Sequence, residues 1–223
     1  SMHLIARRVA LKCSIPWLAD FRDPWTLMYN FKYMGHTRFS RYLNSKLEKR
    51  VLRDASAIVT VTNTISAELS SIGGGRKVHV ITNGYDPQDF EDNTVAHEEG
   101  FTITYTGLFV ETQNPELLWR VLGRIIGHTD ISILNSIAEN GLEKNLIKME
   151  YTPHDQVVLW QRRARVLLLA GGQEPESKGI LTGKFFEYIA AKRAILAIGP
   201  KGGDMDLALE ESGCGKMFNY NDI

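Results

Sequence analysis

The stretch that most constrains the fold of this chain lies between residues 164 and 200. Two apolar runs, residues 164–170 and 194–198, enclose a loop that holds several glycines, residues 171–182, and a segment with helical spacing that begins near Gly183. Apolar runs of this length and composition are typical of buried parallel strands. The stretch therefore predicts a unit of strand, glycine-rich loop, helix and strand.

The predicted helix carries two side chains of opposite charge near its start. In open α/β sheets, ligands bind at the carboxyl ends of strands against a helix N-terminus, where unpaired amides and the helix dipole suit a phosphate. Lys184 lies in the first turn, where a cation is disfavoured unless an anion also binds there. Glu187 lies one turn further on, where its carboxylate can accept hydrogen bonds from sugar hydroxyls. A diphosphate joined to a ribose would engage both, although a solvated lysine and a surface glutamate fit the same spacing. The predicted buried face of this helix consists of Phe185, Tyr188, Ile189 and Lys192.

Composition narrows the class of protein further. The chain has 223 residues, 43% of them hydrophobic, which is enough for one large or two small domains. Its 26 basic and 26 acidic residues cancel, so no overall charge favours nucleic acid as a partner. Cys13 and Cys214 fit two buried thiols in a reducing compartment better than a single disulfide. No apolar run approaches the roughly 18 residues that a membrane-spanning helix needs.

The order of the segments predicts two successive blocks of strand–helix units. The first block has predicted strands over residues 15–19, 57–61 and 77–82. A polar, acidic stretch, residues 87–100, is the best linker candidate. The predicted strands of the second block are residues 101–106, 131–134, 145–151, 164–170, 194–198 and 213–218.

These blocks indicate an α/β fold of two Rossmann-like domains, with parallel sheets flanked by helices. The expected domains are residues 1–92, which is too short for a complete doubly wound sheet, and residues 93–223. Because the first block is short and the last strand lacks a following helix, we expect the sequence to be a piece of a longer protein.

A second group of charges follows the first predicted strand. Asp20, Arg22 and Asp23 lie beside Phe21 and Trp25. Charges at the carboxyl end of a strand in an α/β sheet are candidates for a functional site. An ion pair between Arg22 and a neighbouring aspartate that fixes the turn is an equally good interpretation, because ion pairs are common in loops.

Four stretches in this order resemble the group 1 glycosyltransferases of family 4, which have the GT-B fold. They are Trp17-Leu18-Ala19-Asp20-Phe21-Arg22-Asp23-Pro24-Trp25, Val80-Ile81-Thr82-Asn83-Gly84-Tyr85-Asp86, Tyr105-Thr106-Gly107-Leu108-Phe109 with Asn114-Pro115-Glu116, and Gly183-Lys184-Phe185-Phe186-Glu187-Tyr188. Each motif alone is weak, but four in the right order and spacing are fairly specific. In such an enzyme the second domain binds the donor and the first the acceptor.

The resemblance implies a role for each candidate residue. Glu187 would hold the ribose hydroxyls of the donor, and Lys184 with nearby backbone amides would meet its diphosphate. Gly107 would let the backbone approach the phosphates, since a side chain there would intrude. The donor-binding residues implied are Gly107, Leu108, Thr182, Gly183, Lys184 and Glu187. Arg22 and Asp23 would be catalytic and lie near the transferred sugar.

The activity implied is that of a glycosyltransferase, of the hexosyltransferase type, that uses a nucleotide-diphosphate sugar. The acceptor would be a glycan or a lipid-linked molecule, and the anomeric configuration would be retained. Cationic and amide donors would stabilise the leaving diphosphate, so neither a metal nor another cofactor is expected. The family also implies cell-surface polysaccharide biosynthesis in the cytoplasm, at the inner face of the membrane, with peripheral membrane association through a region N-terminal to this chain.

Two departures from the family pattern keep other interpretations open. Many members carry a first glutamate where Gly179 stands, and a basic residue where Gln113 stands. A non-catalytic module that binds nucleotides or carbohydrates is therefore an alternative. A nucleotide-sugar epimerase of the same architecture is another, because it would use a similar donor pocket without a separate acceptor. A nicotinamide-dependent dehydrogenase does not, because no Gly-x-Gly-x-x-Gly sequence follows a strand and opens a helix.

Overall fold

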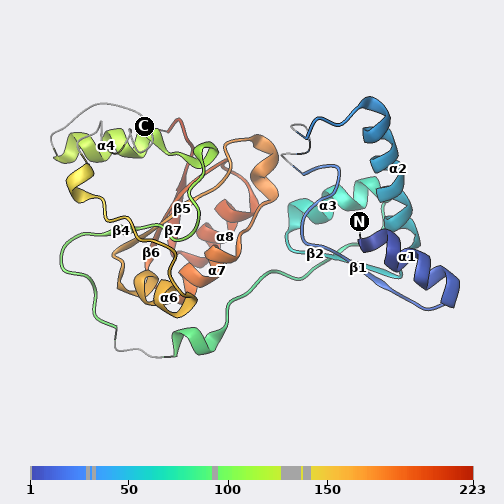
Figure 1. The fold of residues 1–223 in the computed structure, drawn as a ribbon, viewed down its shortest axis with the longest axis horizontal. Helices are drawn as coiled ribbons and strands as arrows, with labels where there is room; N and C mark the ends of the chain where they lie inside the picture. The colour runs from blue at the N-terminus through green and yellow to red at the C-terminus, as the bar shows by residue number, and fades with distance from the viewer. Residues whose placement is uncertain are drawn as a thin grey trace. The chain divides into compact units, whose positions relative to one another are not determined.

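The computed structural model forms two compact units, which are described separately. It describes residues 2–28, 31, 34–91, 95–126, 137 and 142–222. The first unit comprises Ser1–Asn83 with Lys178–Leu181, and the second comprises Gly84–Ser177 with Thr182–Ile223. Each contains its own parallel sheet flanked by helices (Figure 1), as the α/β prediction required. The domain boundary expected between residues 92 and 93 stays a prediction.

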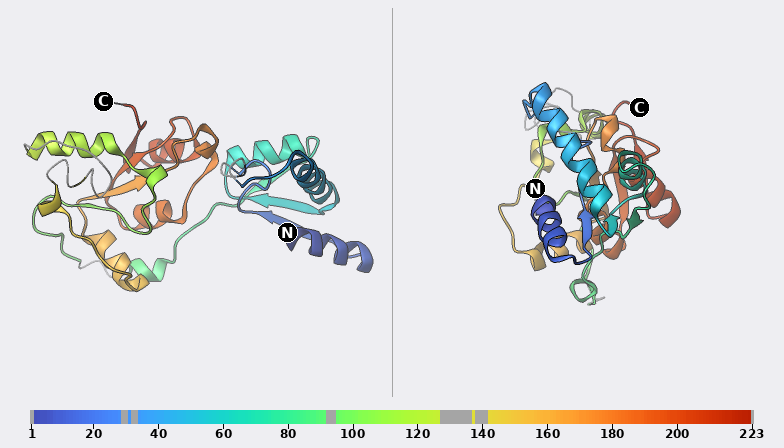
Figure 2. Two further views of the ribbon diagram at one scale, coloured as in Figure 1. Left: turned by 45° about the horizontal axis from the view of Figure 1, so that its top comes forward. Right: turned by 90° about the vertical axis from the view of Figure 1, so that its right-hand side faces the viewer.

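The first unit is built on a three-stranded sheet in the order β1-β2-β3. Its elements are α1 (Met2–Cys13), β1 (Leu18–Phe21), α2 (Arg38–Asp54), β2 (Ala57–Thr60), α3 (Asn63–Ile72) and β3 (His79–Val80). Both pairings are parallel, with Leu18 opposite Ala57 and Val59 opposite His79. The helices α2 and α3 lie on the same side of this sheet in the left view of Figure 2.

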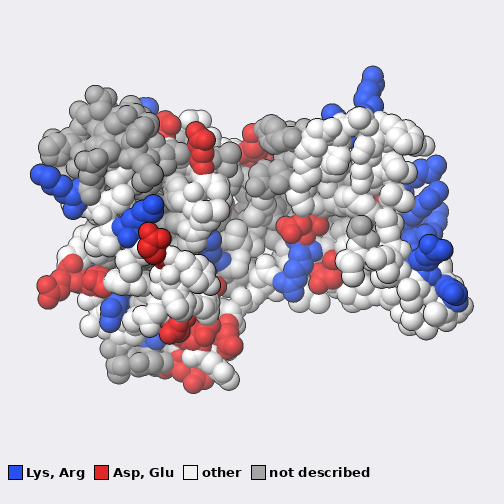
Figure 3. Space-filling view, in the orientation of Figure 1, with Lys and Arg blue, Asp and Glu red and all other residues white. Residues whose placement is uncertain are grey.

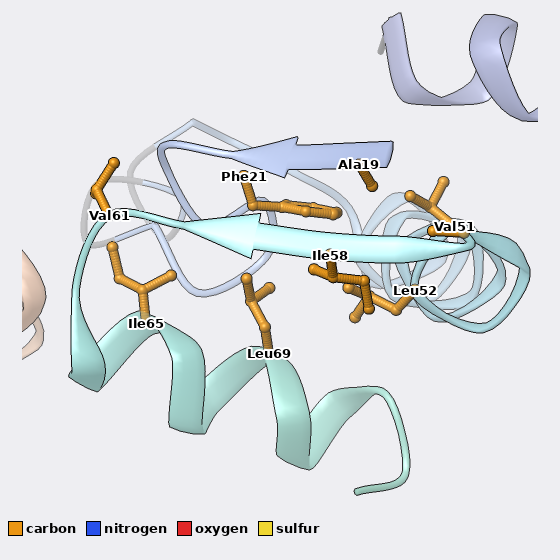
Figure 4. Packing of buried hydrophobic residues seen from close by; sticks show 9 residues of the cluster. Ala19, Phe21, Val51, Leu52, Ile58, Val61, Ile65 and Leu69 are labelled. Atoms are coloured by element: carbon orange, nitrogen blue, oxygen red, sulfur yellow. The ribbon is translucent and has the colours of Figure 1, made fainter. Parts of the chain in front are cut away.

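The core of the first unit lies between the sheet and these helices. Phe21 and Ile58 from the strands meet Leu52 from α2 and Leu69 from α3, and all four are at most 1% exposed (Figure 4). Thr62 begins α3, where its hydroxyl accepts a hydrogen bond from the Ile65 amide. This packing fixes the end of β1, after which Arg22 and Asp23 follow.

The second unit is built on a four-stranded parallel sheet in the order β4-β5-β6-β7. Its strands are β4 (Ile103–Thr104), β5 (Val166–Ala170), β6 (Ala194–Ile198) and β7 (Gly215–Phe218). Its helices are α4 (Glu116–Ile126), α6 (His154–Arg163), α7 (Gly183–Ala190) and α8 (Asp204–Ser212). Short 3-10 turns lie at η2 (Pro87–Phe90), η3 (Glu111–Gln113), η4 (Glu143–Asn145) and η5 (Pro175–Gly179). The segment from β5 through α7 to β6 confirms the strand–loop–helix–strand pattern expected from the sequence.

Several sequence expectations need correction. The first strand spans residues 18–21 instead of 15–19, because Ala19 and Phe21 are the residues that alternate into the core. Residues 145–151 form no strand; Ile147 is 81% exposed and finds no sheet to pair with in the described chain. The strand predicted over residues 131–134 lies outside the described residues.

Two individual side chains also differ from expectation. Lys192 lies beyond the end of α7, exposed and with a φ of 55°, so it does not share the buried face of that helix. Cys13 is exposed and Cys214 is partly exposed, and both are free thiols. The expectation of two buried thiols was therefore wrong.

The chain's zero net charge conceals an uneven surface. Lys and Arg side chains gather over α1 and α2 of the first unit (Figure 3). Helix α1 carries Arg7, Arg8 and Lys12 and no acidic residue.

Among the described residues, no helix is both long and apolar enough to cross a membrane.

Candidate functional site

The candidate donor site is assembled in the second unit where β4 ends and α7 begins. Strand β4 is the neighbour of β5 in the sheet, and the loop after β5 leads into α7. The residues just beyond β4 therefore meet the first turns of α7. This arrangement brings Gly107 next to Lys184, which shares a different motif with Glu187.

Lys184 bridges the two elements. Its Nζ donates a hydrogen bond of 2.8 Å to the Tyr105 hydroxyl and lies 4.3 Å from the centre of the Tyr105 ring. Burial lowers the pKa of Lys184 from its usual value, and the negative charge of Glu187 acts in the opposite direction. The ammonium is thus held at the site while having lost part of its hydration.

Gly107 gives Lys184 the space that it occupies. The glycine has a φ of 104°, which side-chain-bearing residues rarely adopt. A Cβ added there would lie 2.9 Å from Lys184 Nζ and 3.0 Å from its Cε. A side chain at this position would therefore require the end of the lysine side chain to shift, whereas the approach of the backbone to phosphates stays a prediction.

The turn after β4 is fixed by Tyr105. Its hydroxyl donates to the Leu108 carbonyl at 3.0 Å and lies 3.5 Å from Gln113 Oε1. Burial raises the pKa of Tyr105, which keeps the phenol protonated and able to donate. Leu108 takes part through its carbonyl, since the residue is 82% exposed.

Glu187 is held from a different direction by a buried polar chain. Gln161 on α6 donates from Nε2 to Glu187 Oε2 at 2.8 Å and to Thr106 Oγ1 at 3.2 Å. The Tyr188 hydroxyl accepts from the Thr106 amide at 3.1 Å and also lies 3.1 Å from Thr106 Oγ1. Burial raises the pKa of Tyr188 to about 12, so this phenol is neutral.

The start of α7 is left open. Thr182 is its N-cap residue but makes no side-chain cap, and its Oγ1 is buried without a hydrogen-bond partner among the described residues. Gly183 is exposed, and nothing lies within 4 Å of a Cβ added to it. The first-turn amides are thus not capped by the threonine, which suits an incoming anion.

Arg22 and Asp23, the predicted catalytic pair, belong to the first unit and are both exposed. Arg22 Nη1 donates to Asn83 Oδ1 at 2.6 Å, and its Nε lies 3.7 Å from Asp20 Oδ2. The structure thus joins the two motifs of the first unit through one side chain. The Asp20 contact also realises the ion pair that was weighed against a functional role.

The loop that follows this pair is anchored by a residue that sequence reasoning missed. Glu48 on α2 is fully buried and accepts hydrogen bonds from the Trp25 amide at 3.2 Å, the Thr26 amide at 3.3 Å and the Thr26 hydroxyl. Gln161 was missed in the same way. A polar residue three positions after the buried Val158 was the available signal, because these two positions share a helix face.

Comparison with known proteins supports the family. Residues 1–89 match the family model described as Glycosyltransferase Family 4. The fold of the chain is similar to that of sucrose-phosphate synthase from Thermosynechococcus elongatus, with a TM-score of 0.70 at 14% sequence identity. The match covers 99% of this chain and 59% of that one, so the chain spans about three-fifths of the length of this relative. No curated protein sequence matches the chain significantly. The family-model match covers the first unit, and the chain as a whole has the two-sheet α/β fold of a GT-B glycosyltransferase; both agree with the predicted resemblance to the group 1, family 4 glycosyltransferases.

Proposed function

We propose that the protein transfers a sugar from a nucleotide-diphosphate donor and that the second unit binds this donor where β4 meets α7. The observation that carries the proposal is the placement of Lys184 and Glu187 one turn apart at the start of one helix. The lysine lies against Gly107, while the carboxylate is held by Gln161. A diphosphate at the open end of α7 would meet the ammonium and the amides, and the adjoining ribose would reach the carboxylate.

The chemistry follows from which charges these groups can balance. As the bond between the sugar and the diphosphate breaks, negative charge grows on the leaving oxygens. Lys184 and the first-turn amides of α7 would stabilise that charge in a partly desolvated setting. We propose that transfer proceeds with retention of configuration and without a metal, to a glycan or lipid-linked acceptor.

Arg22 and Asp23 have a separate role in this proposal, near the transferred sugar. Their exposure leaves both side chains accessible to a ligand. If this role is correct, Arg22→Ala and Asp23→Ala should lower the rate of transfer while leaving donor affinity unchanged. Loss of nucleotide binding in either variant would contradict the assignment.

Titration of the chain with UDP, GDP and ADP tests the donor site. At least one should bind, and Glu187→Ala should weaken its binding by about 1–3 kcal/mol because charged hydrogen bonds to the ribose are lost. Glu210→Ala, which removes an exposed carboxylate from α8 of the same unit, is the control and should bind as the wild type does. Unchanged affinity in Glu187→Ala would remove the ribose role.

A further inference from the structure

We propose that Gln161 is a positioning residue that sets the orientation of the Glu187 carboxylate for the donor ribose. This inference rests on the proposed function, because it assigns a purpose to the residue behind the proposed ribose ligand. Gln161 lies on α6, 26 positions before Glu187, and is fully buried. Nothing in the motif that contains Glu187 points to it.

The geometry of the amide fixes its direction. Both hydrogens of Nε2 have acceptors, Glu187 Oε2 at 2.8 Å and Thr106 Oγ1 at 3.2 Å. Turning the amide over would place its oxygen against the carboxylate, where two acceptors would repel each other. Gln161 can therefore act only as a donor towards Glu187.

The side-chain oxygen of Gln161 makes no hydrogen bond among the described residues. Gln161 Oε1 is buried and has no hydrogen-bond partner within the described parts of the chain. An unsatisfied buried carbonyl costs free energy, so a glutamine that served packing alone would be replaceable by an apolar side chain of similar shape. The two hydrogen bonds that its nitrogen donates offset this cost.

The second bond of Nε2 ties Glu187 to the end of β4. Thr106 Oγ1 accepts from Gln161 and lies 3.1 Å from the Tyr188 hydroxyl, which in turn accepts from the Thr106 amide. The carboxylate is thus linked to the segment just after β4, in which Thr106 precedes Gly107. In this proposal Oε2 of Glu187 accepts from Gln161 and Oε1 accepts from a ribose hydroxyl.

The test compares Gln161→Met, which keeps the length of the side chain and removes the donor, with the wild type. The probes are UDP, GDP and ADP, each beside a counterpart that lacks both ribose hydroxyls. We expect Gln161→Met to raise the dissociation constant of the hydroxyl-bearing diphosphate about tenfold and to leave that of the counterpart unchanged. In a Glu187→Ala background the same substitution should have no further effect, because the group that it positions is gone.

The outcomes separate the two proposals. If the wild type binds none of the diphosphates, the proposed function fails and this inference fails with it. If Glu187→Ala weakens binding but Gln161→Met does not, or if Gln161→Met weakens both probes equally, only the positioning role is overturned.

A second variant covers a failure of Gln161→Met to fold. Gln161→Leu removes the donor in a shorter apolar side chain, so it should weaken the hydroxyl-bearing probe about as much as Gln161→Met. Wild-type affinity in Gln161→Leu would overturn the inference.

Discussion

The two units present their candidate residues in opposite ways, although both do so beyond the carboxyl ends of parallel strands. In the first unit, Arg22 and Asp23 are exposed, and Arg22 contacts Asn83 and Asp20 at the surface. In the second unit, Lys184 and Glu187 are partly buried and held by Tyr105 and Gln161.

The two units differ in which part of the candidate site is held in place by hydrogen bonds. The second unit fixes its candidate side chains themselves through polar contacts with neighbouring elements. The first unit instead fixes the backbone of the loop behind its charges, through the buried Glu48. An exposed side chain on a fixed loop can follow different acceptors, whereas a held side chain suits one constant group such as a diphosphate.

The largest effect that would test this contrast is expected from Glu48→Ala in the first unit. Removing the carboxylate leaves the Trp25 and Thr26 amides without their acceptor in a part-buried place, which should cost about 2–4 kcal/mol of unfolding free energy. Urea denaturation measures the loss. Glu48→Gln retains an acceptor oxygen and should cost only about 1 kcal/mol; equal losses in both variants would show that charge, and not the hydrogen bonds, holds the loop.

The next effect concerns Lys184→Ala in the second unit. We expect the affinity for a nucleoside diphosphate to fall by about 1.5–3 kcal/mol, since a charge-assisted contact is lost, and the affinity for the bare nucleoside to change little. Calorimetric titration of both ligands checks this. Lys192→Ala, which removes an exposed lysine just after the same helix, serves as control; equal losses for the two ligands would move Lys184 out of the phosphate site.

The depressed pKa of Lys184 adds a dependence on pH to that measurement. Only the protonated lysine attracts the diphosphate, so affinity should fall as the pH rises through a pKa that lies below the usual lysine range. The decline should be absent in Lys184→Ala. A wild-type profile parallel to that of the variant would remove Lys184 as its cause.

A smaller effect is expected from Gly107→Ala. The positive φ should cost about 1–2 kcal/mol of stability, and the new methyl group should displace the lysine ammonium and weaken diphosphate binding. Gly100→Ala has a φ of 86° and open space around its Cβ, so it should show the backbone cost without the loss of binding. Equal binding in the two variants would mean that the close approach at Gly107 is unimportant.

The smallest effect should come from Arg22→Ala. An arginine with 68% of its side chain exposed should contribute less than about 0.5 kcal/mol to stability. Thermal unfolding of the variant beside the wild type measures it. A loss as large as that of Glu48→Ala would abolish the contrast between the two units.

How far the sequence predicts this site depends on whether two residues share an element. The alternation of apolar runs and glycine-rich loops determined two α/β units, and helical spacing placed Lys184 one turn before Glu187. Apolar length alone misjudged residues 145–151, because a strand needs a partner that the pattern does not identify.

Only the tertiary structure decided which distant groups hold these side chains. Tyr105 contacts Lys184 across 79 positions, Gln161 contacts Glu187 across 26, and Arg22 contacts Asn83 across 61. The physical reason is that periodicity fixes which residues lie on one face of a helix or strand, whereas contacts between elements depend on how those faces pack. The sequence by itself therefore determined the charges available at the start of α7, and packing decided their hydrogen-bond partners, their burial and the pKa of the lysine.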